Sequence, residues 1–415
     1  MRGLVALASA KNTVSQALLL MGPLQGLRVL ELGTLIAGPF CTRILAEFGA
    51  EVIKIEAPGE GDPLRTWRKM YQGTSLWWFV QSRNKKSVTI NLKHPEGQEI
   101  VRRLAQDCDI LVENFRPGAL EKWGLGYEQL SAGNPGLVMV RLSGYGQSGP
   151  YRDQPGFGAI GEAMGGIRFV TGYPDRPPVR AGISLGDSIA AMYGVIGALM
   201  ALHARAANGG RGQVVDVALY EAVFSLMESL LPEYDMFGFV RSRSGASLPG
   251  IVPSNTYVTR DGKYIVIGAN ADSIFKRLMT AIGREDLAND PALARNEGRV
   301  TRTEELDEAI GGWCAQHDLE RVLEVLASAE VPSGKIYDVA DIVRDVHYQA
   351  RGMLETHRLS DGAALKLPGI VPKLSDTPGT TRWVGPALGA HTGEVLRALG
   401  YADRDIERLR ADGVI

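Results

Sequence analysis

The pair Gly186-Asp187 stands where a long apolar segment begins, and both residue types suit covalent chemistry. A carboxylate at the start of a helix lies near the positive end of the helix dipole, so it stays ionised and can act as a nucleophile. A glycine beside it lets another molecule approach closely. Aspartate is also a preferred helix N-cap, and the local pattern alone favours capping. Asp187 is therefore interpreted as a nucleophile or as a cap.

Other mechanisms lack the residues that they need. The six histidines show no metal-ligand spacing, and no phosphate-binding loop of the form G-x-x-x-x-G-K-S/T occurs. Residues 182–186 match the G-x-S-x-G pattern of serine hydrolases, with Ser184 as the serine. The approach to it, residues 177–180, is a poor central strand, whereas a hydrolase elbow needs a buried one. A thioesterase acting through Ser184 is thus a remote alternative.

Cations follow two of the predicted strands. Lys93 comes directly after residues 87–92, and Arg116 and Lys122 follow residues 109–115. Because the carboxyl ends of parallel strands bind ligands in α/β sheets, these cations could form a phosphate-binding rim. Each one taken alone is more typical of a solvated surface charge.

The elements that would position these residues alternate along the first half of the chain. Helices are expected at residues 41–48 and 95–108, between strands at residues 27–32, 51–56, 87–92, 109–115 and 136–143. Alternation predicts an α/β fold, a Rossmann-like parallel sheet covered on both faces. The turn at residues 33–39 lacks the dinucleotide fingerprint, so Glu56 is interpreted as a solvated strand end.

A helix over residues 188–206 is apolar or small on all sides, which predicts a buried, tightly packed helix and a rigid support for Asp187. A different pattern begins near residue 240. A hairpin (255–258 with 263–268) precedes helical segments near 273–283, 302–316 and 318–329, and two more helices are expected at 391–399 and 403–411. Three parts follow: an extension (1–22), a large Rossmann-like domain (23–225 plus 350–415) and a small α+β domain (226–349).

Composition excludes several classes of protein. The chain has 415 residues, 45% hydrophobic and 22% charged, which is typical of a soluble globular protein. The net charge of −2 gives no general attraction to nucleic acid or acidic membranes, and no segment is expected to span a membrane. The cysteines (Cys41, Cys108, Cys314) form no disulfide framework, which indicates a reducing, cytoplasmic compartment.

Several short motifs, taken in order, carry a family resemblance that extends from about Pro23 to the C-terminus. They lie at residues 37–39, 49–56, 84–87, 112–118, 144–147, 186–187 and 388–392. In order and spacing the chain resembles the class III coenzyme A-transferases, a family that includes formyl-CoA transferase, carnitine CoA-transferase and α-methylacyl-CoA racemase. The resemblance implies an interlocked homodimer, or a heteromer with a paralogous subunit, and no prosthetic group or metal.

The resemblance also implies roles for single residues. Asp187 would be the nucleophile, forming a mixed anhydride and then a thioester with CoA. CoA contacts would fall on Ile36, Ala57, Ile90, Asn91, Lys93, Asn114, Phe115, Arg116 and Lys122. Formyl-CoA transferase has Gln and Arg where this chain has Ile36 and Ala57, so formate and oxalate are not expected substrates.

The sequence of residues 250–253 resembles that of family members that use succinyl-CoA and dicarboxylates. Arg65, Arg83 and Arg180 are candidates for holding a distal carboxylate as a bidentate pair. Racemases of the family need a histidine where this chain has Phe157, and a phenyl ring exchanges no proton. A CoA-transferase is therefore favoured over a 2-methylacyl-CoA racemase, or epimerase, and over a non-catalytic partner subunit.

Overall fold

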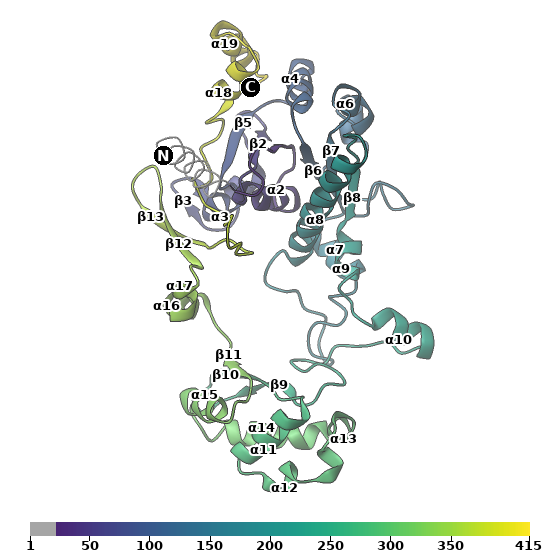
Figure 1. The fold of residues 1–415 in the computed structure, drawn as a ribbon, viewed down its shortest axis with the longest axis vertical. Coiled ribbons are helices and arrows are strands. Elements are labelled where there is room, and N and C mark those ends of the chain that lie inside the picture. The colour runs from purple at the N-terminus through teal and green to yellow at the C-terminus, as the bar shows by residue number, and fades with distance from the viewer. Residues whose placement is uncertain (1–21) are drawn as a thin grey trace, which may run out of the picture. The chain divides into compact units, whose positions relative to one another are not determined.

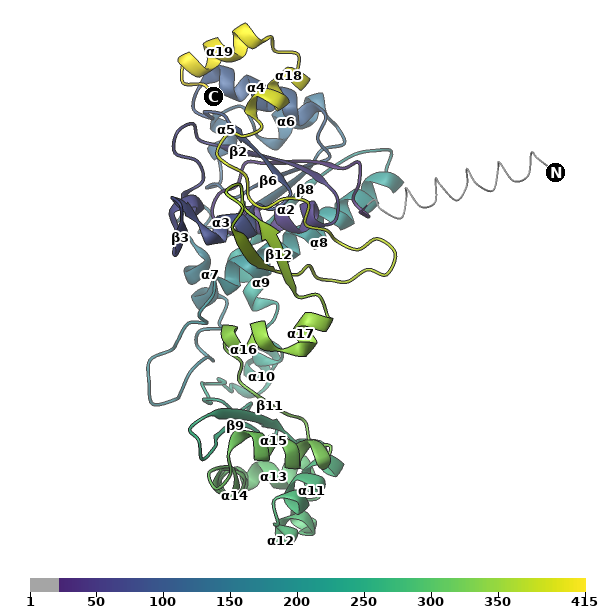
Figure 2. The same ribbon diagram turned by 90° about the vertical axis from the view of Figure 1, so that its left-hand side faces the viewer.

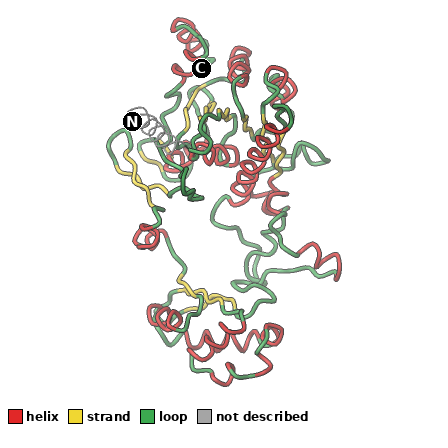
Figure 3. The backbone as a smooth tube through the Cα atoms, viewed as in Figure 1, coloured by secondary structure: helices red, strands yellow, loops and turns green. Residues whose placement is uncertain are grey.

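The computed structural model describes residues 22–415, so the predicted extension lies outside the described residues except for its last glycine. The chain forms two compact units (Figure 1). Unit 1 holds the residues up to Ile167 together with Ala181–Leu231 and Arg351–Ile415, and unit 2 holds Arg168–Arg180 and Pro232–Ala350. The segment Arg168–Arg180, which has no helix or strand (Figure 3), thus belongs with the small unit, whereas the sequence analysis assigned it to the large one.

Unit 1 is built on a six-stranded sheet in the order β5-β2-β1-β6-β7-β8, and every neighbouring pair in it is parallel. The strands are β1 (Arg28–Glu31), β2 (Glu51–Glu56), β5 (Lys85–Thr89), β6 (Ile110–Glu113), β7 (Val138–Ser143) and β8 (Val214–Ala218). The predicted parallel sheet is confirmed. Strand β8 was not predicted from the sequence, because Asp216 interrupts its apolar residues and the next helix follows it with no turn residue between them.

Alternate side chains of each strand point to opposite faces, and helices cover both faces (Figure 2). Leu30, Ile53 and Leu111 join one core cluster, and their neighbours Val29, Val52 and Ile110 join the other. The first face is covered by α4 (Pro95–Gln106), α6 (Tyr127–Gly133), α18 (Thr392–Ala398) and α19 (Asp403–Ala411). The second is covered by α2 (Ala37–Glu47), α8 (Leu185–Ala207) and α9 (Leu219–Phe224).

The remaining elements of unit 1 are short. They are η1 (Pro63–Thr66), β3 (Met70–Tyr71), β4 (Thr74–Ser75), α3 (Leu76–Gln81), α5 (Ala119–Lys122), α7 (Gly158–Met164), β12 (Leu354–Arg358) and β13 (Ala364–Pro368). Helix α7 packs against α8 and α9, and β12 and β13 form a hairpin of their own.

Helix α8 is only partly buried, so the prediction of a helix buried on all sides is wrong. Its small residues face inward, where Gly194 lies against Val140 and Leu142 of the sheet. Its apolar residues Met192 and Met200 are 45% and 67% exposed. The helix is long and apolar enough to cross a membrane by length and composition alone, but it packs against α2, β7 and β8 as a core helix does.

Unit 2 contains an antiparallel sheet in the order β11-β10-β9. Its elements are α10 (Leu230–Phe237, whose first residues fall in unit 1), β9 (Ser254–Val258), β10 (Tyr264–Gly268), α11 (Asp272–Ala281), α12 (Glu285–Ala288), η2 (Pro291–Leu293), α13 (Asn296–Thr301), α14 (Thr303–Cys314), α15 (Leu319–Ser328), β11 (Ser333–Lys335), α16 (Val339–Arg344) and α17 (Val346–Ala350). The predicted hairpin is confirmed as β9 and β10. Strands β9 and β10 share one core with α11, α14 and α15, with Ile265, Phe275, Ile310 and Val322 among its buried residues.

Candidate active site

Asp187 lies in the first turn of α8, and the N-cap of this helix is Ser184. The interpretation of Asp187 as the N-cap is therefore wrong, since it stands three residues further into the helix. The side chain of Ser184 makes no capping hydrogen bond. The carboxylate of Asp187 nevertheless lies near the positive end of a 23-residue helix, as the sequence analysis expected.

The first glycine of helix α7, Gly158, lies directly against this carboxylate. A Cβ atom added to Gly158 would lie 2.0 Å from Oδ2 of Asp187, so only the absence of a side chain lets the two come together. One turn further on, Gly161 lies against α9 in the same way, since a Cβ atom added to Gly161 would lie 2.8 Å from Cβ of Leu219. Helix α7 therefore packs against its neighbours through its backbone. The carboxylate of Asp187 contacts the main chain of Gly158 and not a side chain of that residue.

The residue before this contact, Phe157, is 69% exposed. Phe157 precedes α7, and its neighbour Gly156 lies against the ring of Tyr145. An exposed aromatic ring one residue before the glycine that contacts Asp187 suits a wall for the apolar part of a small substrate.

A cavity of about 380 Å³ opens at the carboxyl ends of β1, β2, β5 and β6. Five of the nine predicted CoA contacts line it: Ala57, Ile90, Asn91, Lys93 and Phe115. The other four do not. Ile36 is buried at the start of α2, Asn114 bonds the loop after β1, and Arg116 and Lys122 are exposed in the segment after β6.

The wall of the cavity contains an aromatic residue that the sequence analysis missed. Trp123 follows the predicted Lys122 and lies edge-on to Phe115, with ring centroids 5.4 Å apart and an interplanar angle of 82°. The two perpendicular rings make an apolar corner in the same cavity as the exposed Lys93, which suits a ligand with an aromatic base and phosphates. The only signal available was a tryptophan directly after a lysine, at the end of the short helix α5 that follows β6.

A buried ion-pair network fixes the loops of this cavity. Nζ of Lys54 lies 2.7 Å from Glu31 and 2.8 Å from Asp62, and Nζ of Lys85 lies 2.8 Å from Glu31. Burial raises the pKa of the Glu31 carboxyl, but the two ammonium groups outweigh it and the pKa falls below its usual value. Burial lowers the pKa of Lys85 to about 8.

This network reaches the backbone of two loops. The Asp62 carboxylate accepts the N–H of Leu35, whose φ of 63° is unusual for leucine, at 3.1 Å. Lys54 donates to the carbonyl oxygen of Gly33 at 2.9 Å. Asn114 bonds both backbone groups of Thr34 at 2.8 Å. The loop after β1 is therefore held in one conformation from both sides.

Two of the predicted carboxylate-binding arginines are committed elsewhere. Arg65 makes a bidentate pair with Glu56, at 2.7 and 2.9 Å, and lies 3.6 Å above the ring of Trp78. Glu56 is 4% exposed, so its interpretation as a solvated strand end is wrong. Arg83 is fully buried, 3.0 Å from Glu47. Both guanidinium groups serve the structure, because burial makes an unpaired charge costly. Arg180 is exposed and belongs to unit 2.

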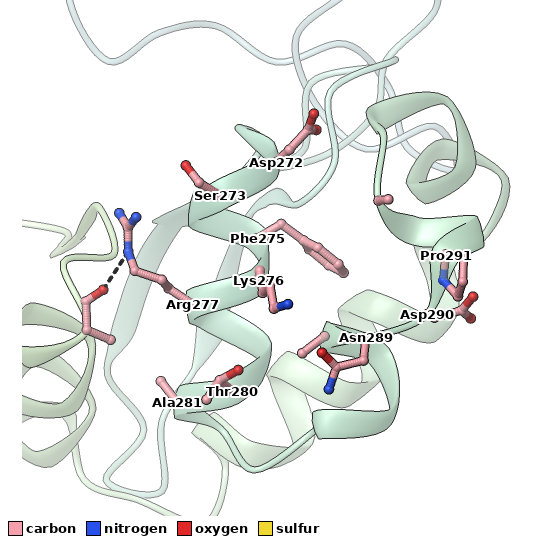
Figure 4. A pocket seen from close by; sticks show the side chains of 13 residues that line it. Asp272, Ser273, Phe275, Lys276, Arg277, Thr280, Ala281, Asn289, Asp290 and Pro291 are labelled. Atoms are coloured by element: carbon pink, nitrogen blue, oxygen red, sulfur yellow. Dashed lines mark hydrogen bonds between the residues drawn. The ribbon is translucent and has the colours of Figure 1, made fainter.

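A second cavity, of about 830 Å³, lies in unit 2 between α11 and the segment after α12 (Figure 4). None of the predicted site residues lines it. Three of its charged groups have partners: Asp272 pairs with Arg299, Asp290 pairs with Arg302, and Arg277 donates to the carbonyl oxygen of Ala329, the bond drawn in Figure 4. Within residues 22–415 no cluster of side chains has the make-up of a metal site.

Asp187 and the cavity of unit 1 lie at the same edge of the sheet. The cavity adjoins the carboxyl ends of four strands, and α7 packs on α9, which follows the carboxyl end of β8. All six strands are parallel, so these ends share one edge, where α/β sheets bind ligands.

Comparison with known proteins agrees with this geometry. Residues 24–392 match CoA-transferase family III. A succinyl-CoA–D-citramalate CoA-transferase of Chloroflexus aurantiacus is 52% identical over 95% of this chain and 98% of its own length. The beta subunit of a succinyl-CoA–L-malate CoA-transferase of the same organism is 44% identical over 95% of this chain and 98% of its own.

A crystal structure of a CAIB/BAIF family protein from Brucella suis superposes with a TM-score of 0.81 and 34% sequence identity, over 91% of this chain and all of that one. The family resemblance recognised in the sequence is confirmed. With matches that extend over nearly the whole chain, this protein belongs to CoA-transferase family III and is a CoA-transferase.

Proposed function

We propose that this enzyme transfers CoA reversibly from succinyl-CoA to a small dicarboxylic acid, with Asp187 as the covalent carrier. The observation that carries the proposal is the carboxylate of Asp187 against the backbone of Gly158, at the same sheet edge as the cavity of unit 1. The donor and acceptor are inferred from similar proteins, whose names give succinyl-CoA with citramalate or malate.

The reaction proceeds in four balanced steps. A carboxylate oxygen of Asp187 attacks the thioester carbon of succinyl-CoA, the C–S bond breaks, and the electron pair leaves as CoA thiolate. The thiolate attacks the Asp187 carbonyl carbon of the resulting anhydride and releases succinate. The acceptor carboxylate then attacks this aspartyl thioester and frees the thiolate again. The thiolate finally attacks the acyl carbon of the acceptor and restores Asp187, so the thioester energy is conserved.

The cavity of unit 1 would hold the nucleotide end of CoA. Phe115 and Trp123 offer a surface for the adenine ring, and Lys93 offers a charge for phosphate. Arg116 and Lys122, which are exposed nearby in sequence, remain candidates for further phosphate contacts. The pantetheine arm would then run along the sheet edge toward Asp187, across the ends of β6 and β7.

The acceptor would lie against Phe157 and Asp187. Arg65 and Arg83 are withdrawn as ligands of its distal carboxylate because both are buried in ion pairs. Arg180, which is exposed in unit 2, stays the sequence-based proposal for that role. Phe157 also argues against a racemase, because no proton-exchanging group stands at that position.

We further propose that the enzyme works as a homodimer in the cytoplasm. The exposed apolar residues of α8 and α10, such as Met200 (67%) and Phe237 (81%), are the kind of surface that a partner subunit covers. The three cysteines are free and buried, which suits a reducing compartment. A heteromer is the alternative, because one relative is named as a beta subunit. Light scattering at micromolar concentration tests this, and a monomer would contradict it.

The test of the reaction is the substitution Asp187→Asn, which keeps the shape of the side chain and removes the nucleophilic oxygen. We expect transfer to be abolished while the affinity for succinyl-CoA stays within a factor of about three, because the cavity is unchanged. Wild-type enzyme incubated with succinyl-CoA and hydroxylamine should carry a hydroxamate on the Asp187 peptide, detected by mass spectrometry.

Three outcomes would reject this proposal. Substantial turnover by Asp187→Asn would show that Asp187 is not the nucleophile. If Ser184→Ala abolished activity instead, a thioesterase acting through Ser184 would be favoured. Solvent deuterium entering the α-carbon of a 2-methylacyl-CoA at a catalytic rate would favour a racemase. A wild-type chain with no CoA exchange against malate, citramalate, itaconate, glutarate or benzylsuccinate would favour a non-catalytic partner subunit.

A further inference from the structure

Glu162 is a buried carboxylate that no step of the proposed reaction uses. It lies on α7, is 2% exposed, and stands four residues after Gly158. Residues four apart share one face of a helix, so Gly158 and Glu162 both face α8. Gly158 contacts Asp187, and Oε1 of Glu162 accepts the backbone N–H of Gly186 at 3.3 Å.

The first turn of α8 needs such an acceptor. The first N–H groups of any helix have no partner within the helix, and a side chain at the N-cap usually accepts one of them. Ser184, the N-cap of α8, makes no such bond. Glu162 supplies the missing acceptor from another helix. A negative charge at this position is also stabilised by the positive, N-terminal end of the dipole of α8.

Packing makes this contact rigid. A Cβ atom added to Gly186 would lie 3.0 Å from the carbonyl oxygen of Gly158 and 3.1 Å from Cγ of Glu162. The two helices therefore meet through glycines, and the Glu162 side chain fills the space between them. Since Asp187 follows Gly186 directly, whatever holds the Gly186 N–H also sets where the Asp187 carboxylate points.

We infer that Glu162 is a positioning residue for Asp187, acting as an N-cap supplied by α7 to the first turn of α8. It touches neither substrate nor CoA, because its side chain is enclosed between α7 and α8. This inference rests on the proposed role of Asp187 as the nucleophile. In this role Glu162 contributes an acceptor oxygen at the end of a side chain of this length. The amide oxygen of a glutamine has the same reach, so it should accept the Gly186 N–H equally well.

A matched pair of variants tests whether the acceptor oxygen of Glu162 matters or only the volume of its side chain. Glu162→Gln keeps both the length and an acceptor oxygen, whereas Glu162→Met keeps the volume and loses the acceptor. We expect Glu162→Met to lower kcat by roughly 10- to 100-fold, because small misplacement of a reacting group costs this much. KM for succinyl-CoA should stay within about twofold, since the cavity of unit 1 does not involve Glu162. Glu162→Gln should keep most of the wild-type kcat.

Two further measurements distinguish the positioning of Asp187 from a general contribution of Glu162 to stability. Hydrogen exchange over residues 184–190 should be faster in Glu162→Met than in the wild type and Glu162→Gln. The rate at which hydroxylamine traps the Asp187 adduct, per mole of folded enzyme, should fall with kcat. Glu128→Met, at an exposed glutamate of α6, is the control and should change neither quantity.

The inference is overturned if Glu162→Met turns over at the wild-type rate, if it raises KM and leaves kcat unchanged, or if Glu162→Gln is as impaired as Glu162→Met. Glu162→Ala serves in place of Glu162→Met if methionine prevents folding, with the same expectations. A wild-type enzyme that forms no Asp187 adduct would instead reject the proposed function, so the two failures are distinguishable.

Discussion

The contact between Gly158 and Asp187 allows a quantitative prediction. In Gly158→Ala the new methyl group would lie 2.0 Å from Oδ2 and 2.7 Å from Cγ of Asp187, whereas ordinary contacts begin at 3.4 Å. The carboxylate must therefore move by about 1.4 Å. The opposite response, a shift of α7, is resisted because Gly161 and Gly165 are also packed tightly, with added Cβ atoms 2.8 Å from Leu219 and 2.7 Å from Val223 of α9.

A displacement of about 1 Å at a reacting group costs on the order of 100-fold in rate, which is about 2.7 kcal/mol in activation free energy. We expect kcat of Gly158→Ala to fall by that factor. KM for succinyl-CoA should not change, because the cavity of unit 1 is not touched by the substitution. Stability should fall by about 1–3 kcal/mol, the usual cost of adding a methyl group to a tightly packed contact.

Steady-state kinetics with succinyl-CoA and the best acceptor of the panel measures both parameters, and hydroxylamine trapping reports the covalent step alone. Gly312→Ala is the matched control, because Gly312 is a helical glycine with no atom within 4 Å of its added Cβ. A Gly158→Ala enzyme with wild-type kcat would refute the reasoning. So would one whose loss is entirely in KM, since that would place the strain in the CoA site.

Two other predictions concern the CoA cavity and unit 2. Trp123→Ala should raise KM for succinyl-CoA by roughly 10- to 100-fold with little change in kcat, because base–aromatic stacking is worth about 1–3 kcal/mol; an unchanged KM would mean that adenine does not lie on the Phe115–Trp123 surface. Asp261 has its pKa lowered to about 2 by the hydrogen bond from Thr259, against burial, with further bonds from Lys263 and from the N–H of Leu319. A lowered carboxyl pKa stabilises the folded state at pH above the unfolded value of 3.8, and this contribution is lost as the pH falls through 2. Thermal melts between pH 2 and 6 should therefore show a smaller acid destabilisation for Asp261→Asn than for the wild type, and parallel curves would contradict the role of Asp261.

Much of the fold follows from local pattern. The alternation of apolar strands with helices predicts a parallel sheet, because a strand connected through a helix returns parallel to its neighbour. A parallel sheet collects the carboxyl ends of its strands at one edge, which is why Ala57, Ile90, Lys93 and Phe115 converge on one cavity although they are far apart in the chain. The start of α8 was equally visible, since a glycine and an aspartate precede a long apolar run.

The partners of the buried charges could not be predicted in the same way. Lys54 faces Glu31 because β2 lies beside β1 in that register, and Lys85 joins them from β5 on the other side of β2. Arg65 and Glu56 find each other only when the loop after β2 folds back on the strand. A charged residue is read from sequence as solvated or ligand-binding, because its burial depends on strands that are distant in the chain.

The sequence by itself determined the family of this protein, the class of its fold and the residue proposed as nucleophile, since all three are written in local motifs and their order. Only the tertiary structure decided what surrounds that residue. Gly158 and Glu162 lie more than twenty residues before Asp187, and nothing in their local pattern marks them. They matter because α7 packs backbone to backbone on α8, and close packing of two helices depends on the shape of both faces at once.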